Sequence, residues 1–318
     1  MSPAARRGRI LRGLRALTRP PPHAVVTVGV FDGVHRAHQR LIRSVIRMAR
    51  RRGGRSVILT FDPDPQTVLR PARAQPSLMP LGERLTHLQA LGADVVWVVP
   101  FTRRFARMTA AQFIRRILID RVHAEVLLVG EAFAFGRGRR GDMEVLRALG
   151  PRYGMRVVPV RQVTDGGEPI SSSRIRQLIA KGHLGLARRL LGRAPALYGR
   201  VVRGTGRGRR FHVPTANVQL GPHALPPSGV YAVRLRRLGH PRAVRGVMNL
   251  GTRPTFGAGP LVCEVHLLGF SGTLTGQPVS VSLLARLRSE RCFPSPAALY
   301  RQVRRDLRRA RRLFPRLT

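Results

Sequence analysis

The apolar residues of the first half of the chain alternate between two kinds of segment. Five short runs rich in β-branched residues predict buried strands, at residues 24–29, 56–61, 94–99, 125–130 and 156–160. Five longer segments repeat their apolar residues with the helical period, at residues 37–52, 83–91, 109–122, 171–180 and 184–191. Strands that alternate with helices predict a parallel sheet covered on both faces, whose ligands bind beyond the carboxyl ends of the strands.

The pattern changes after Gly192. Five apolar runs separated by Gly/Pro turns predict a small antiparallel β-barrel, with strands at residues 198–203, 229–238, 246–250, 262–268 and 279–287. A terminal helix is expected to begin with Ser295 as N-cap and Pro296 at the first helical position. We therefore expect two domains, an α/β domain over residues 1–194 and a β-barrel domain over residues 195–318.

The charge of the chain is extreme, with a net value of +43. Lys181 is the only lysine among 58 basic residues, and such use of arginine is typical of GC-rich coding sequences. An arginine-rich surface attracts phosphates, so non-specific nucleic-acid binding is expected at low salt. Because only 5% of the residues are aromatic, platforms for stacking bases are scarce. Charge alone therefore does not indicate a dedicated nucleic-acid-binding protein.

Cysteine usage and hydropathy bear on the compartment. Cys263 and Cys292 form no CxxC pair, and no apolar run is long enough for a membrane span, so we expect a cytoplasmic protein that does not contact a membrane. Residues 1–22 are basic and faintly amphipathic, which leaves a transit peptide or an interfacial helix as alternatives. The sequence does not indicate an oligomeric state.

The first candidate site follows the first strand, in the segment Val28-Gly-Val-Phe-Asp-Gly-Val-His-Arg-Ala-His38. Glycines let a backbone approach a phosphate closely, and a helix N-terminus offers unpaired N–H groups. His35 and His38 share one helix face and can donate ring N–H bonds to phosphate oxygens. Two surface histidines beside a capped helix are the structural alternative for this pattern taken alone.

This segment resembles the GxFDGxHxGH motif of the nucleotidyltransferases of the HIGH superfamily, and residues 170–176 resemble their ISSTxIR signature. The resemblance implies a Rossmann-like domain that transfers a nucleotide to a phosphate acceptor, with pyrophosphate as leaving group. Catalysis would then rest on positioning and on stabilising the charge at the α-phosphate. The resemblance implies catalytic roles for His35 and His38, and nucleotide binding by Gly29, Phe31, Asp32, Gly33, Ser172, Ser173 and Arg176.

The second candidate site is in the barrel half, where residues 199–217 resemble the riboflavin kinase signature GxVxxGxxxGRxLGxPTAN. Four further segments resemble elements of that family and follow in the same order, at residues 227–231, 249–256, 263–266 and 287–293. Phosphoryl transfer to a primary alcohol needs a base, a metal ion and a clasp for ATP. Hydroxyl and amide oxygens such as those of Thr215 and Asn217 suit Mg²⁺.

What the resemblance implies for this half is a set of roles. Glu264, a carboxylate on an apolar strand, is implied to be the base, and Thr215 and Asn217 the magnesium ligands. Gly204 and Gly208 are implied to bind the nucleotide, and Asn249 and Arg288 the flavin.

The two halves in this order resemble the bacterial bifunctional riboflavin kinase/FAD synthetase family over almost the whole chain, and residues 9–16 fit its lead-in. The resemblance implies that the protein uses ATP and Mg²⁺ to phosphorylate riboflavin to FMN and to adenylylate FMN to FAD. Ala37, Asp64 and Ala132 depart from the family pattern in the transferase half, whereas departures at His212, Gly269 and Thr275 spare the kinase base and metal ligands. Two alternatives therefore stay open: a riboflavin kinase with a weakened or lost adenylyltransferase activity, and a basic RNA-associated protein on an enzyme fold.

Overall fold

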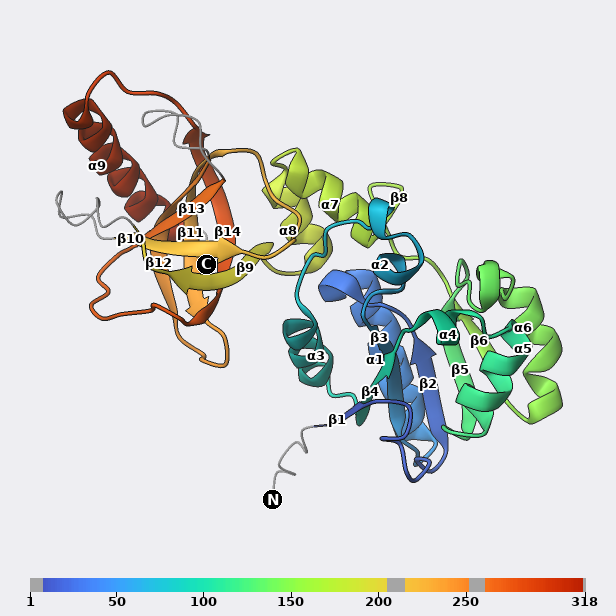
Figure 1. Cartoon of the computed structure of the whole chain (residues 1–318). Helices are drawn as coiled ribbons and strands as arrows, with labels where there is room; N and C mark the ends of the chain where they lie inside the picture. Colours follow the sequence, from blue (N-terminus) through green and yellow to red (C-terminus); the bar gives the residue numbers. More distant parts are fainter. Residues whose placement is uncertain (1–7, 205–214, 252–260, 317–318) are drawn as a thin grey trace. The chain divides into compact units, whose positions relative to one another are not determined.

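The computed structural model describes residues 8–204, 215–251 and 261–316, which form two compact units (Figure 1). The first unit runs to Gln75 and from Pro80 to Ser171, and the second holds Pro76–Met79 and the chain from Ser172 onward. The second unit therefore includes helices α7 (Ser172–Ala180) and α8 (Leu184–Leu191). These units group residues that contact one another in space, which does not test where one domain ends along the chain. The boundary expected between residues 194 and 195 therefore stays a prediction.

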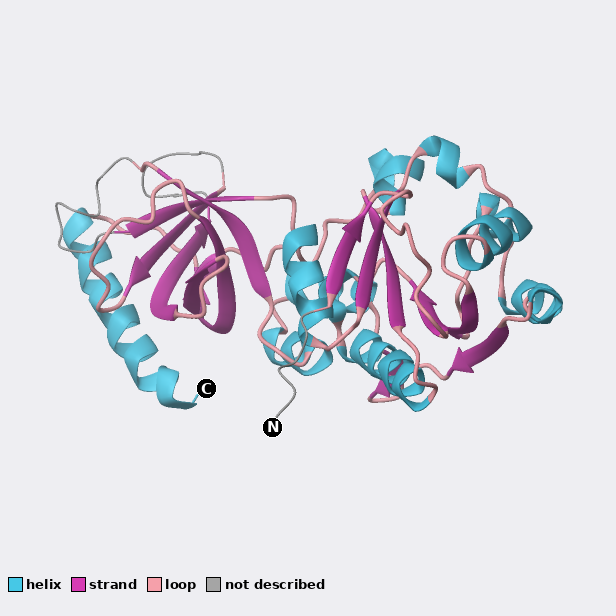
Figure 2. Cartoon of the chain, turned by 90° about the horizontal axis from the view of Figure 1, so that it is seen from below, coloured by secondary structure: helices cyan, strands magenta, loops and turns pink. Residues whose placement is uncertain are grey.

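The first unit is built on a six-stranded sheet in the order β1-β4-β3-β2-β5-β6, in which every neighbouring pair is parallel. Its strands are β1 (Arg9–Arg12), β2 (Ala24–Val28), β3 (Ser56–Asp62), β4 (Val95–Pro100), β5 (Ala124–Gly130) and β6 (Arg156–Val160). Figure 2 shows helices on either side of this sheet. The predicted parallel α/β domain is confirmed.

The helical elements of this unit are mostly short. They are η1 (Asp32–Val34), α1 (Arg36–Arg51), α2 (Pro65–Leu69), η2 (Pro71–Arg73), α3 (Leu81–Ala90), α4 (Arg103–Ala106), α5 (Ala110–Phe113), the π-helix η3 (Ile114–Ile119), η4 (Arg137–Arg139), α6 (Met143–Leu149) and η5 (Pro151–Tyr153). A small hairpin, β7 (Thr164–Asp165) with β8 (Glu168–Pro169), ends the unit. The capping box at Thr109 and Gln112 is confirmed, but the single helix expected over residues 109–122 is split into α5 and the π-helix.

Burial of the central strands on both faces explains their apolar runs. Val26, Leu59 and Trp97 lie in one core, and the inward stripe of α1, which includes Ile42 and Val45, is buried. Each fully buried aliphatic side chain contributes about 1.5–3 kcal/mol relative to exposure. The two-sided burial fixes the strand ends in space, and with them the loops that follow.

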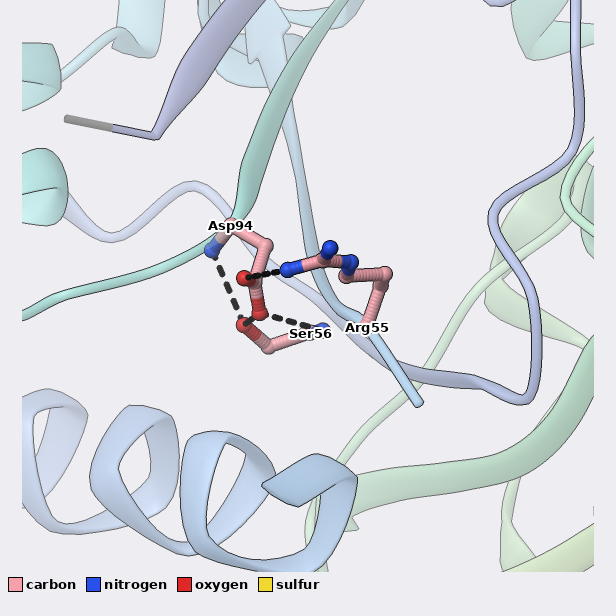
Figure 3. Close-up of polar contacts among 3 residues, drawn as sticks. All are labelled: Arg55, Ser56 and Asp94. Carbon is pink, nitrogen blue, oxygen red and sulfur yellow. Dashed lines mark hydrogen bonds and ion pairs between the residues drawn. The ribbon is translucent and has the colours of Figure 1, made fainter. Parts of the chain in front are cut away.

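A polar cluster joins β3 to β4 at the amino ends of these strands (Figure 3). The Ser56 backbone N–H and hydroxyl donate to Asp94 Oδ2 at 2.9 and 2.6 Å, and Arg55 Nη1 donates to Oδ1 at 3.1 Å. Burial raises the pKa of Asp94, but these hydrogen bonds outweigh it and hold the pKa below its ordinary value. The cluster stabilises the amino ends of these strands, whereas the candidate site lies at the carboxyl ends.

The N-terminal segment corrects one expectation. Residues 9–12 form β1 and pair in parallel with β4, Arg9 opposite Val95 and Leu11 opposite Trp97. The interfacial-helix alternative is therefore wrong for these residues, while residues 1–7 lie outside the described ranges. A strand of four residues is too short for a periodic pattern to reveal, so only its pairing partner identifies it.

The second unit contains a closed six-stranded barrel in the order β10-β13-β12-β11-β14-β9, with all pairs antiparallel. Its strands are β9 (Ala196–Val202), β10 (Thr215–Leu220), β11 (Gly229–Arg237), β12 (Ala243–Gly251), β13 (Val262–Leu267) and β14 (Pro278–Ser289). The expected barrel is confirmed. The sequence did not predict β10, because its residues read as a turn within the kinase signature.

Helix α9 (Pro296–Leu313) lies along the outside of the barrel and continues into η8 (Phe314–Arg316) (Figure 1). Ser295 caps it as expected, with its hydroxyl accepting from the Ala298 N–H at 3.2 Å. Ala310 and Phe314 pack against Val230 and Leu287 on the outer face of the barrel. The barrel interior is a separate apolar core that includes Tyr231, Met248 and Cys263.

Candidate active sites

Three predicted kinase residues form one row across three neighbouring strands of the barrel. Strand pairing sets Asn217 of β10 opposite Glu264 of β13, and Glu264 opposite Asn249 of β12. Directly paired residues in an antiparallel sheet point to the same face with Cβ atoms about 4.5–5.5 Å apart. Thr215 lies two residues before Asn217, hence on the same face. The register therefore brings together residues from three separate sequence motifs.

The face on which the row lies follows from the alternation along β13. Cys263 and Val265 point into the barrel core, so Glu264 between them points outward and is only half-buried. Burial, with a smaller effect of the Glu264 carboxylate, raises the pKa of the Cys263 thiol to about 12. The Cys263 thiol therefore stays protonated at physiological pH, on the face of β13 opposite the Glu264 carboxylate.

The predicted nucleotide glycines are placed only in part. The backbone of Gly204 packs so closely on the Asn217 amide that a Cβ at this position would collide with it. A side chain at this position would displace the amide of a predicted metal ligand, so glycine leaves room for that amide. Gly208 lies outside the described residues.

Arg288, a predicted flavin contact, is engaged in a buried ion pair. Its Nε lies 2.9 Å from Asp306 Oδ2 in α9, and the two side chains are 11% and 6% exposed. Gln302 Nε2 donates to Asp306 Oδ1 at 2.8 Å. The Arg288 guanidinium also lies over the Phe293 ring, 5.5 Å from its centroid. Asp306 was not predicted from the sequence, although an acidic residue in so arginine-rich a helix was a usable signal.

The transferase loop lies at the carboxyl end of β2 and has an unusual backbone. Phe31, Gly33 and Val34 have φ values of 56°, 78° and 39°, all in the left-handed region. A positive φ is rare for a β-branched residue such as Val34, and such conformations often mark functional sites. Asp32 and the Phe31 ring are buried, and a Cβ on Gly29 would meet that ring. The predicted nucleotide-binding residues of this loop therefore form one tightly packed turn.

The two predicted catalytic histidines are stacked at the start of α1. His35 is 3% exposed and caps the helix, its Nδ1 accepting from the His38 N–H at 3.4 Å. The imidazole rings lie 3.5 Å apart between centroids, at an angle of 19°. The pKa of His38 is lowered well below its ordinary value of 6.5, mainly by burial and further by the nearby charges of His35 and Arg84. His38 is therefore neutral at physiological pH.

Arg84 is a residue of this site that the sequence analysis missed. It lies in α3 and is only 6% exposed. Its Nη1 donates to the Val30 carbonyl and its Nη2 to the Phe61 carbonyl, both at 2.9 Å. The helical pattern of residues 83–91 gave no sign of it, because arginine is so frequent in this chain that a single arginine does not stand out.

Ser172, Ser173 and Arg176 lie in the first turns of α7, within the second unit. Arg176 Nε donates to the Pro76 carbonyl at 2.7 Å. Because the loop from Gly29 to His38 belongs to the first unit, a joint site of these residues with the histidines stays a prediction.

Two of the three departures from the transferase pattern are explained locally. Asp64 caps α2, its Oδ1 accepting from the Gln66 N–H at 2.8 Å. Ala37 is the second residue of α1, where a helix-favouring residue is preferred over glycine. Ala132 is exposed, and nothing in the structure explains its identity.

Comparison with known proteins assigns a family model to each half. The FAD synthetase model matches residues 18–174, and the riboflavin kinase model matches residues 191–314. The bifunctional riboflavin kinase/FMN adenylyltransferase of Escherichia coli K12 is 38% identical over 96% of this chain and 98% of its own length. The enzyme of the same name from Pseudomonas fluorescens is 36% identical over 96% of this chain and 97% of its own length.

A solved structure agrees with the fold. A crystal structure titled macrolide-efflux protein, from Streptococcus pneumoniae, matches with a TM-score of 0.79 and 31% identity, over 91% of this chain and 94% of that one. Among the described residues, no helix has the length and apolar character needed to cross a membrane.

Proposed function

The chain belongs to the family of bifunctional riboflavin kinase/FMN adenylyltransferases, and on that premise we propose how its residues divide the two reactions. It phosphorylates riboflavin to FMN and adenylylates FMN to FAD, with ATP as the donor in both steps. The assignment of residues to steps is our proposal, and the row Asn217–Glu264–Asn249 is the observation that carries it.

In the kinase reaction, Glu264 is the general base. Its carboxylate accepts the proton of the primary hydroxyl of riboflavin as that oxygen attacks the γ-phosphate of ATP, the bond to the bridging oxygen breaks and ADP leaves. Its place on the outer, half-buried face of β13 supports this role, since the carboxylate is accessible to a substrate but lies over the apolar core. Asn249, its neighbour on β12, is a flavin contact, and Arg288, two strands further along the row, is another.

The donor set on β10 fits Mg²⁺ shared with a nucleotide. Thr215 and Asn217 offer two neutral hard oxygens, and the described residues contain no group of three His, Cys, Asp or Glu side chains that could hold a metal ion. Mg²⁺ often binds through few protein oxygens together with substrate phosphates, which matches so sparse a set. Bound there, the ion would neutralise phosphate charge, and the absence of a side chain at Gly204 leaves room for the Asn217 amide.

In the transferase reaction, a phosphate oxygen of FMN attacks the α-phosphate of ATP and pyrophosphate leaves. His35 and His38 donate hydrogen bonds to the phosphates at the start of α1, and the backbone of Gly29 and Gly33 lies close to the nucleotide. Phe31 and Asp32 hold the turn. We assign the departing pyrophosphate to Ser172, Ser173 and Arg176.

The basic surface supports a weaker, secondary binding activity. Helix α9 carries arginine at seven of its 18 positions, and Arg305, Arg308, Arg309 and Arg312 line a hollow on it. We propose that nucleic acid binds such surfaces without sequence preference, with an affinity that falls steeply as salt rises. Sequence-selective binding that persists at physiological salt would contradict this. The expected cytoplasmic location likewise stays a prediction.

The test is a crossed assay on two variants of the full chain. Wild type is incubated with ATP, Mg²⁺ and either riboflavin or FMN, and FMN and FAD are separated and quantified. Glu264→Gln should lose about 10²–10⁴-fold in FMN formation and keep FAD formation from FMN. His38→Gln should show the reverse pattern. The proposed division of roles is wrong if either variant loses FMN formation and FAD formation equally, or if either variant loses neither activity.

A further inference from the structure

Arg84 joins the carboxyl ends of two neighbouring strands. Its guanidinium bridges the carbonyl of Val30, just after β2, and that of Phe61, near the end of β3. The Val30 carbonyl also accepts from Thr60 Oγ1 at 3.1 Å. Val30 immediately precedes the left-handed turn at Phe31. The carbonyl that leads into the predicted phosphate-binding loop is therefore held by two side-chain hydrogen bonds, one from Arg84 and one from Thr60.

A cation at this place is costly for stability. A buried charge needs strong compensation, and many buried ion pairs can be replaced by apolar groups without loss. Burial lowers the pKa of Arg84, and Asp32, Asp64 and Asp62 oppose that effect. Its Nε has no hydrogen-bond partner among the described residues. Core packing alone therefore does not account for arginine here, and a catalytic role is one of the recognised explanations for a buried unsatisfied group.

The histidine pair lies within the electrostatic reach of this charge. The charged and titratable groups that act on His38 or on Arg84 come from the turn, from the end of β3 and from α3: His35, Asp32, Asp62, Asp64 and Arg84 itself. The Nδ1 atom of His38 is buried without a partner among the described residues. A neutral His38 with one ring N–H suits donation to a phosphate. Burial is the main cause of its lowered pKa, and His35 and the positive charge of Arg84 act in the same direction.

We propose that Arg84 is a positioning residue for adenylyl transfer, which fixes the Val30 carbonyl and hence the turn, and supplies a permanent positive charge that acts on His38. The proposal rests on the proposed role of His35 and His38. Arg84 itself touches neither substrate. Its two contributions, the carbonyl bridge and the charge, are separable, because lysine keeps the charge without the planar two-pronged geometry.

The experiment compares Arg84→Lys and Arg84→Met in the full chain. FAD formation from FMN and ATP is measured across the pH range in which histidine titrates, with kcat and KM determined separately. Riboflavin phosphorylation by the same molecules is the internal control. We expect Arg84→Met to lower kcat for adenylylation about 10²-fold, the cost typical of misplaced catalytic groups, with FMN formation unchanged.

The pH profile distinguishes positioning from a merely structural role. Loss of the charge raises the pKa of His38 toward its ordinary value, so the acid limb of the Arg84→Met profile should move to higher pH. Arg84→Lys should lower kcat while its acid limb stays where it is in wild type. Equal loss of both activities, or an acid limb that does not move in Arg84→Met, overturns the proposal.

Two controls keep the outcomes separate. If Arg84→Met does not fold, Arg84→Lys decides alone, since a normal adenylylation kcat in that variant excludes the carbonyl bridge as a requirement. His38→Gln tests the underlying assignment: unchanged adenylylation in that variant removes the histidine role. If His38→Gln loses adenylylation while both Arg84 variants have normal kinetics, the role of the histidine stands and only the role of Arg84 is wrong.

Discussion

The two candidate sites are built by different physical means. In the barrel, Asn217, Glu264 and Asn249 are placed by strand register, and the ladder that aligns them consists of backbone hydrogen bonds. In the α/β unit, the site is a turn with left-handed residues, and His35 is at once a helix cap and a predicted catalytic group. In the barrel, backbone pairing therefore places the functional row, whereas in the loop one predicted catalytic side chain also caps the helix that it serves.

The largest effect is expected from breaking the buried ion pair that holds Arg288 in the barrel unit. Asp306→Asn removes one partner of the buried pair with Arg288 and leaves a charge uncompensated, which typically costs about 3–5 kcal/mol. We expect the free energy of unfolding of the barrel unit to fall by that order, as measured by denaturant titration followed by the kinase activity. FAD formation from FMN should survive to higher denaturant. Loss of kinase activity without loss of stability would assign Asp306 to the site itself.

The loop site can be tested by separating the cap from the ring. His35→Asn keeps a good N-cap, whereas His35→Ala loses it at a cost of about 1 kcal/mol. Both variants lack the imidazole, so both should lose about 10²–10³-fold in FAD formation. Thermal unfolding should single out His35→Ala as the less stable variant. Full adenylylation in His35→Asn would mean that the loop histidine is only a cap.

The departures from the family pattern sharpen the comparison further. We expect FAD formation to be slower than FMN formation, and the double variant Ala37→Gly, Ala132→Asp to gain up to about 10²-fold in FAD formation, because a polar contact near the phosphates is restored. Adding Asp64→His should lower stability by about 1 kcal/mol, since Asp64 caps α2. Rates no faster than wild type in both the double and the triple variant would show that the departures are neutral.

The smallest expected effect is that of replacing Asp94, at the amino ends of the strands. The pKa of Asp94 is lowered in the folded state, so its contribution to stability is complete above the ordinary aspartate pKa near 4 and is lost as pH falls through the lower folded value. Asp94→Asn should lower stability by about 1 kcal/mol at neutral pH and flatten the acid dependence. Both activities should stay unchanged. The measurement is urea unfolding at several pH values, with exposed Glu131→Gln as the charge-matched control.

Several features of this protein were readable from the sequence because they are local. The strand runs, the Ser295 cap, the Thr109–Gln112 capping box and the change from helical to antiparallel pattern near Gly192 all depend on residues a few positions apart. The two families were readable as well, since their motifs are contiguous strings. These motifs also named Glu264 and both histidines.

The tertiary structure alone decided which residues lie together. Strand register set Asn217, Glu264 and Asn249 side by side, and no local pattern specifies which strands pair. Burial made Arg84 a bridge between two strand ends and Asp306 the partner of Arg288, although each is one charged residue among many in the sequence. The physical reason is that propensity and periodicity act over a few residues, whereas burial and pairing depend on parts of the chain far apart in sequence.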